Sequence, residues 1–79
     1  MQHKELADIY LIVSNNIKKY RLKNHITQRE LAIKCGYSYT YIRQIEAKKC
    51  IKNFSIQTIY NISTALNVNI VQLFEKDNI

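Results

Sequence analysis

The segment of residues 27–46, TQRELAIKCGYSYTYIRQIE, carries the strongest structural signal in the chain. Thr27 is a favourable N-cap and Glu30, three residues later, completes a capping box, so a helix should begin directly after Thr27. The helix should end just before Gly36, the chain's only glycine, because glycine adopts without strain the left-handed conformation that often ends helices. We therefore predict a helix over residues 28–35 that is followed by a tight turn.

A second helix start follows this turn at once. Ser38 is a favourable N-cap, and the next helix is predicted over residues 39–46. Only the three residues 36–38 separate the two helices. Two short helices joined by such a glycine-containing turn form the helix-turn-helix motif, whose second helix enters the major groove of DNA.

Helical patterns also flank this motif. Apolar residues at three- and four-residue steps precede it, and Ser55 can cap another helix after it. Asn67 tolerates left-handed backbone and can close that helix, while Asn69 and Gln72 form a weaker capping box for a last short helix. The predicted helices span about 5–23, 28–35, 39–46, 56–66 and 70–76. We therefore expect a compact all-α domain of five helices that comprises the whole chain, residues 1–79.

The charge is concentrated in the middle of the chain. The total is +6, but residues 18–52 hold ten Lys or Arg against Glu30 and Glu46, which gives this block +8 and leaves the flanks at −2. A basic block between slightly acidic ends is typical of a surface that binds a polyanion. Ordinary solvated lysines are the alternative interpretation of the same pattern.

The composition argues against several other classes of protein. The soft metal ligands lack CxxC spacing, so we expect no metal and no other cofactor, and we interpret Cys35 and Cys50 as reduced thiols. There is no nucleophile-base pair, carboxylate dyad or phosphate-cradling glycine loop, so we expect neither an enzyme nor a small-molecule substrate. Without a signal peptide or an apolar run of roughly 18 residues, the protein should be soluble and cytoplasmic, with no membrane partner.

Residues 17–74 resemble the helix-turn-helix family of phage Cro and CI-type repressors, also called the Xre family. This segment covers nearly three quarters of the chain, and its matching stretches are IKKYRLKNHITQRELAIKCGYS, YIRQIE and SIQTIYNISTALNVNIVQLF. The resemblance implies a lambda-repressor-like domain of five helices that dimerises through its C-terminal helices and binds a pseudo-palindromic operator in double-stranded DNA. Within the family, the short length, the TYI of residues 40–42 and the SIxxI of residues 55–59 are similar to controller proteins of restriction-modification systems.

The resemblance also implies roles for individual residues. Gln28 would hydrogen-bond a phosphate at a helix start, where the helix dipole favours an anion. Arg21 and Glu46 match positions that form a structural ion pair. The groove-facing side of the second motif helix would comprise Ser38, Tyr39, Thr40, Arg43 and Gln44. The dimer interface would include Ile70, Val71 and Phe74.

Physical chemistry ranks these DNA-facing residues. Arg43 should read a base, because its guanidinium fork matches the two acceptors on guanine's major-groove edge, with a phosphate contact as the alternative. Tyr39 and Thr40 lie at the helix end that enters the groove first, although a solvated tyrosine that covers its neighbours is the alternative for Tyr39. The direction of Tyr41 is left open.

The loop after the motif departs from the family pattern. Ala47 and Lys48 occupy a stretch where the family commonly has a glycine, and the loop to Ser55 is about two residues longer than usual. Lys48 and Lys49 are nevertheless assigned to the DNA-binding surface, since each neutralised phosphate adds salt-dependent affinity. Solvated lysines without a DNA contact are the alternative.

Two functions from different classes follow from these patterns. The first is a homodimeric transcriptional regulator that binds a specific operator, in particular a restriction-modification controller. The second is an antitoxin-like or phage-type protein whose main role is to bind a partner protein through its apolar C-terminal residues.

Overall fold

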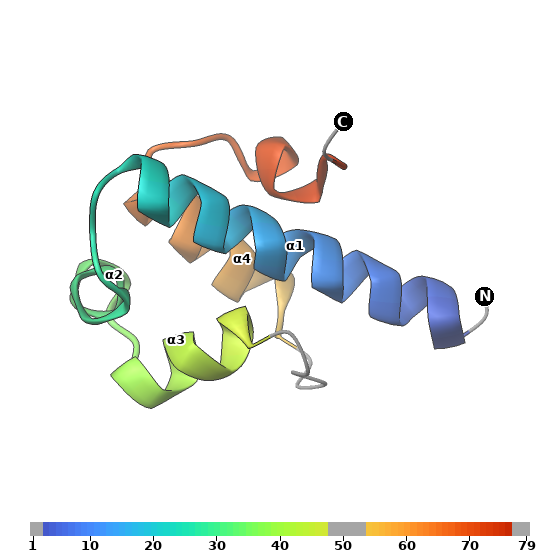
Figure 1. Cartoon of the computed structure of the whole chain (residues 1–79), viewed down its shortest axis with the longest axis horizontal. Coiled ribbons are helices and arrows are strands. Elements are labelled where there is room, and N and C mark those ends of the chain that lie inside the picture. Colours follow the sequence, from blue (N-terminus) through green and yellow to red (C-terminus); the bar gives the residue numbers. More distant parts are fainter. Residues whose placement is uncertain (1–2, 48–53, 77–79) are drawn as a thin grey trace.

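Four α-helices and one 3-10 helix make up the part of the chain that the structure, a computed structural model, describes, residues 3–47 and 54–76 (Figure 1). In chain order the elements are α1 His3–Lys23, α2 Gln28–Cys35, α3 Tyr39–Glu46, α4 Ile56–Ala65 and η1 Ile70–Phe74. The long helix α1 packs against α3 and η1, while α2 packs against α3 and α4. In Figure 1 α1 crosses the molecule, with α3 below it and η1 above it.

The prediction of five α-helices is wrong at the last element. Residues 70–74 form a single 3-10 helix instead of an α-helix over 70–76. The N–H of Gln72 donates to the Asn69 carbonyl oxygen at 2.9 Å, which is the three-residue step of a 3-10 helix. Asn16 of α1 holds this element in place, because its buried side-chain amide donates to the backbone carbonyl oxygens of Leu73 at 2.9 Å and Glu75 at 2.7 Å, and Leu73 itself is buried in the core.

The turns between helices have the backbone geometry that their residue types favour. Among the described residues, only His25, Asn67 and Gly36 have positive φ, at 58°, 59° and 77°. The helix α4 ends at Ala65, one residue before the predicted end, and Asn67 follows its C-cap Leu66, as expected for a residue that tolerates left-handed backbone. The helix α1 begins at His3, two residues before the predicted start.

A single apolar core joins all five elements. Each helix contributes the residues of its inward face, which lie three or four positions apart. The buried residues are Val13, Ile17, Leu31, Ala32, Ile42, Ile45, Phe54, Ile59, Ile62, Leu66 and Leu73. Full burial of one such large side chain contributes about 1.5–3 kcal/mol, so this core holds α2 and α3 rigidly against α1 and α4. No helix in the described ranges has both the length and the apolar character needed to cross a membrane.

Candidate nucleic-acid interface

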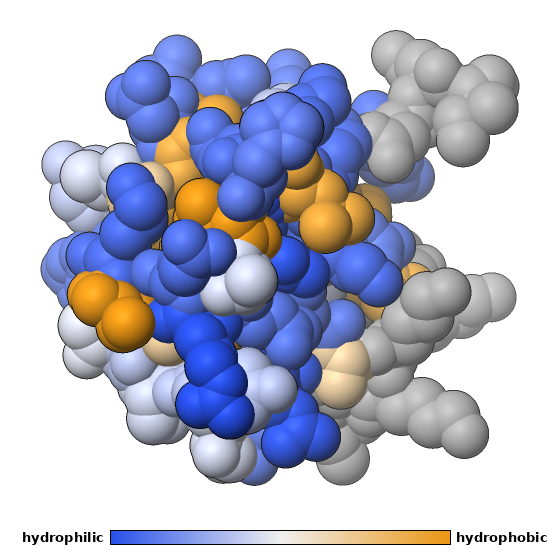
Figure 2. Space-filling view, turned by 60° about the vertical axis from the view of Figure 1, so that its left-hand side comes forward, coloured by the Kyte–Doolittle hydropathy of each residue, from blue (hydrophilic) through white to orange (hydrophobic). Residues whose placement is uncertain are grey.

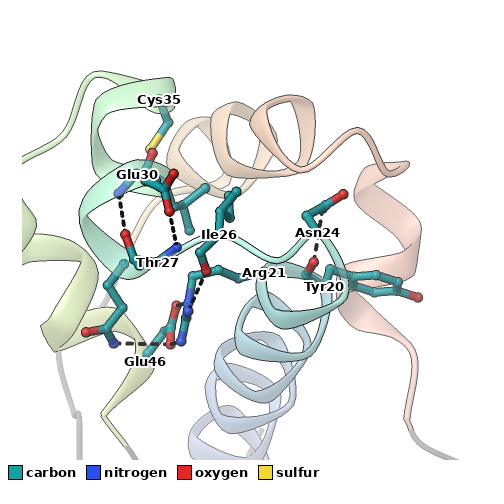
Figure 3. A network of polar contacts seen from close by, with 10 residues as sticks. Tyr20, Arg21, Asn24, Ile26, Thr27, Glu30, Cys35 and Glu46 are labelled. Carbon is teal, nitrogen blue, oxygen red and sulfur yellow. Dashed lines mark hydrogen bonds and ion pairs between the residues drawn. The ribbon is translucent and has the colours of Figure 1, made fainter.

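The start of α2 is fixed by a capping box (Figure 3). The Glu30 backbone N–H donates to the Thr27 hydroxyl at 3.0 Å, and the Thr27 backbone N–H donates to the Glu30 carboxylate at 2.8 Å. These hydrogen bonds to its charged form lower the pKa of Glu30 below the ordinary value. The predicted capping box is confirmed, and it fixes the first turn of α2.

The turn between α2 and α3 also has the predicted geometry. Gly36 is left-handed at φ 77°, and its N–H donates to the Ala32 carbonyl oxygen at 2.9 Å. No atom lies within 4 Å of the position that a Cβ of Gly36 would occupy, so glycine is required there by backbone conformation and not by crowding. Ser38 then caps α3, since its hydroxyl accepts from the Tyr41 N–H at 3.0 Å. A short, rigid turn therefore joins α2 to α3.

The helix α3 has one inward face and one outward face. Ile42 and Ile45 are buried, whereas Ser38, Thr40 and Arg43 are exposed. Tyr39 and Gln44 are half-buried on the flanks. In Figure 2 the lower half of the molecule, the side of α3 in Figure 1, is largely hydrophilic, and hydrophobic atoms gather in the upper half.

Arg21 and Glu46 form the predicted ion pair behind this surface (Figure 3). The Arg21 Nε donates to Glu46 Oε2 at 2.8 Å and Nη2 donates to Oε1 at 3.0 Å, with the side chains only 9% and 2% exposed. Arg21 Nη1 also donates to the Ile26 carbonyl oxygen at 2.8 Å. This network ties the end of α1, the loop before α2 and the end of α3 together.

Gln28 joins the same network. Its side-chain amide donates to Glu46 Oε1 at 3.2 Å. An amide carries two N–H donors and one carbonyl acceptor. This bond uses one donor of Gln28 and leaves its second N–H and its carbonyl oxygen for other hydrogen bonds at the start of α2. The structure therefore places Gln28 between the buried ion pair and the surface at the N-terminus of α2.

Tyr37 and Tyr41 belong to the scaffold. Their rings pack edge to face with centroids 5.2 Å apart, and the hydroxyls of both lie within 3.5 Å of Thr58 on α4. Asn61 of α4 donates to the Tyr37 hydroxyl at 2.8 Å. The direction of Tyr41 is thereby settled toward α4, away from the outward face of α3.

An arginine that sequence reasoning did not single out completes the surface. The Arg29 guanidinium of α2 lies over the Tyr39 ring, with its Cζ 4.1 Å from the ring centroid. Arg43, one turn along α3 from Tyr39, lies 5.6 Å from the same centroid. Nothing in the local pattern of α2 marks Arg29, because its neighbour Tyr39 is brought to it only by the packing of α2 on α3.

The remaining predicted residues lie elsewhere. Lys48, Lys49 and Cys50 fall outside the residues that the structure describes. The Cys35 thiol donates to the Leu31 carbonyl oxygen at 3.0 Å, and burial raises its pKa.

The predicted interface residues near the C-terminus lie apart from the surface of α3. Ile70 packs partly against the core, while Val71 is 63% and Phe74 39% exposed. Val71 and Phe74 are three residues apart and so stand on the same side of η1. Tyr60 of α4, 54% exposed, lines a groove that Val71 also borders.

Comparison with known proteins agrees with this geometry. A family model described as helix-turn-helix matches residues 17–73. The chain belongs to the helix-turn-helix family of the Xre, Cro and CI type. This is a family of transcriptional regulators that bind double-stranded DNA.

Relatives within the helix-turn-helix family are similar over most of the chain. Control protein C.SmaI of Serratia marcescens is 31% identical over 72 residues, which are 91% of this chain and 83% of that protein. The uncharacterised HTH-type transcriptional regulator y4dJ of Sinorhizobium fredii is 29% identical over 84% of this chain and 83% of its own length. The crystal structure of the hypothetical transcription factor NHTF from Neisseria superposes with a TM-score of 0.78 at 28% identity, covering 85% of this chain and 75% of that one.

Proposed function

We propose that this protein is a transcriptional regulator that binds a pseudo-palindromic operator in double-stranded DNA as a homodimer. The outward face of α3 carries the proposal, because the buried Arg21–Glu46 pair and the caps of α2 and α3 hold it rigidly at the surface. Rigid presentation lowers the conformational entropy that is lost when side chains are ordered against a base edge.

The proposed contacts divide into base reading and backbone positioning. Arg43 reads a guanine edge through its two parallel N–H donors, and Thr40, exposed in the first turn of α3, contacts a base or a thymine methyl group. Ser38 and Gln28 lie at the starts of α3 and α2 and contact phosphates, where backbone N–H groups favour an anion. Tyr39 and Gln44 flank these contacts, and Lys48 and Lys49 add phosphate contacts from the following loop.

The proposed dimer uses the surface of α4 and η1. Val71 and Phe74 are exposed apolar side chains at its edge, with Ile70 packed behind them. A two-fold axis through this surface places the two α3 helices about 34 Å apart, one turn of B-DNA, and so predicts half-sites one helical turn apart.

The regulator is proposed to be a controller of a restriction-modification system. The motifs at residues 40–42 and 55–59 and the similarity to Control protein C.SmaI over 91% of the chain support this assignment. The coding regions beside the gene of this protein test it, because a controller is expected next to a restriction enzyme and a methyltransferase.

Selection of duplexes from a randomised DNA library tests the proposed operator. We expect enrichment of a symmetric sequence with two half-sites, protected as a pair in footprinting. Binding should weaken steeply with salt at every sequence, since phosphate contacts dominate affinity, but the preference for the selected site should persist. Binding that is equal for all duplexes at all salt concentrations contradicts the proposal.

Light scattering of the purified chain tests the homodimer. Val71→Asp should produce a monomer, because a carboxylate at the interface would be buried without a partner. Tyr39→Phe is a matched control on the opposite surface and should leave the dimer intact. A monomeric wild-type chain that forms a stable complex only with a neighbouring gene product would instead support the antitoxin-like alternative.

A further inference from the structure

Two guanidinium groups from different helices lie near the Tyr39 ring. Arg29 of α2 is at stacking distance, with 4.1 Å between its Cζ and the ring centroid, and Arg43 of α3 is at 5.6 Å. Arg29 and Arg43 are both exposed, and Tyr39 is half-buried. A tyrosine ring attracts a cation over its face with about 0.5–1 kcal/mol at an exposed site, so the ring holds the two arginines in one cluster.

The described part of the chain supplies no anion to this cluster. Among the side chains that the structure describes, no carboxylate forms an ion pair with Arg29 or Arg43. The nearby carboxylates are committed elsewhere, since Glu30 accepts in the capping box and Glu46 accepts from Arg21. Arg29 also lies in the first turn of α2, where the helix dipole disfavours a cation. Two arginines in such surroundings are suited to bind a polyanion.

The two arginines differ in what they can reach. Arg43 and Tyr39 are four residues apart on the outward side of α3, the helix proposed to enter the groove. Arg29 belongs to α2, which in this motif lies across the backbone and outside the groove. A guanidinium has five N–H donors and remains free to donate from its edge while its face is stacked on a ring.

We propose that Arg29 is a positioning residue for DNA recognition, an inference that rests on the proposed function. Its guanidinium stacks on Tyr39 and binds the sugar-phosphate backbone through its edge. The stacked Tyr39 ring then limits the orientations of Arg43 before DNA binds. Arg29 thereby contributes to sequence preference through Tyr39, without contacting a base itself.

The test compares Arg29→Lys with Arg29→Gln on two probes, a duplex selected from the randomised library and a scrambled duplex of the same composition. Lysine keeps the charge but loses the planar face, so Arg29→Lys should keep the salt dependence and lower the ratio of specific to scrambled affinity roughly two- to fivefold, the size of one exposed cation–π contact. Arg29→Gln should lower this ratio as well and reduce the salt slope by about 1.

A second pair of variants separates stacking from charge. Tyr39→Leu removes the ring and should lower the ratio further than Tyr39→Phe, which keeps the ring and removes only the hydroxyl. In Tyr39→Leu the further change Arg29→Lys should have no effect on the ratio, because the stacked partner is already absent. Urea unfolding of each variant confirms that the comparison is made between folded proteins.

Two results overturn the inference. If Arg29→Lys retains the wild-type ratio, Arg29 is at most a phosphate contact and has no role in sequence preference. If Arg29→Lys lowers the ratio equally with and without the Tyr39 ring, it does not act through that ring. A wild-type protein without any preference between the two probes instead refutes the proposed function itself, so the two failures are distinguishable.

Discussion

The buried Arg21–Glu46 pair and the exposed Arg29 and Arg43 lie at the same helix-turn-helix motif but have opposite surroundings. Arg21 is buried against Glu46, with two N–H donors on the carboxylate and a third on a backbone carbonyl. Arg29 and Arg43 are exposed near the Tyr39 ring, and among the described residues neither forms an ion pair with a carboxylate. The motif therefore uses one residue type for two different purposes.

The difference shows that the partner of a charge, and not the charge alone, identifies its role. A buried arginine that is paired with a carboxylate is not accessible to DNA, and its removal leaves the opposite charge stranded. An exposed arginine without a paired anion contributes little to the stability of the fold. It can bind a phosphate or a base without first breaking an ion pair. Loss of DNA binding in an Arg21 variant would thus report unfolding and not a lost contact.

The largest expected effect is on the buried side. Glu46→Ala should lower the free energy of unfolding by about 3–5 kcal/mol, because it leaves Arg21 charged and buried without its partner. Urea denaturation followed by circular dichroism measures this change. A loss below 1 kcal/mol would show that water reaches Arg21. The buried pair and the exposed arginines would then differ less in their surroundings than their geometry indicates.

The matching change on the exposed side should affect binding and not folding. Arg43→Gln should weaken binding to the selected duplex by about 1–3 kcal/mol relative to a scrambled one, the worth of a bidentate base contact. The free energy of unfolding should change by less than about 0.5 kcal/mol, as for an exposed residue without a structural partner. Equal weakening on both duplexes would make Arg43 a phosphate contact.

A change in the turn between α2 and α3 should have an intermediate effect on stability alone. Gly36→Ala places a side chain at φ 77°, which costs roughly 1–2 kcal/mol, and open space around that position means that no clash adds to it. The folded fraction should bind the selected duplex with wild-type affinity. If affinity falls further than the folded fraction explains, the turn also sets the angle between α2 and α3.

The smallest effect concerns the capping box at the start of α2. The pKa of Glu30 is lowered in the folded protein by the hydrogen bonds from Thr27, so the ionised carboxylate stabilises the fold at neutral pH. That contribution should be lost as pH falls through this lowered pKa, and unfolding curves from pH 7 to pH 2 should show less acid sensitivity in Glu30→Gln than in the wild type. Identical pH profiles would mean that the exposed cap contributes nothing measurable.

Local signals were sufficient for α2 and α3. Thr27, Glu30, Gly36 and Ser38 act on backbone groups within a few residues, so both helices have the predicted bounds, 28–35 and 39–46. Caps depend on neighbouring backbone groups alone, which is why they can be read before the fold is known. The Arg21–Glu46 pair spans 25 residues and was expected only through the family resemblance.

Two features depended on contacts that no local pattern reports. The side chain of Asn16 reaches the carbonyls of Leu73 and Glu75 across 57 and 59 residues, and this contact joins α1 to the last element, which is a 3-10 helix where an α-helix was expected. The stack of Arg29 on Tyr39 joins two helices that meet only in the folded core.

The amino-acid order was enough to establish where the helices of the motif start and stop and which face of α3 is polar, because caps and helical periodicity act over one or two turns. The folded arrangement was needed to show which arginine is neutralised and which remains available for an anion. Charge pairing and stacking are set by distances between separate helices, and these distances exist only once the apolar core has brought the helices together.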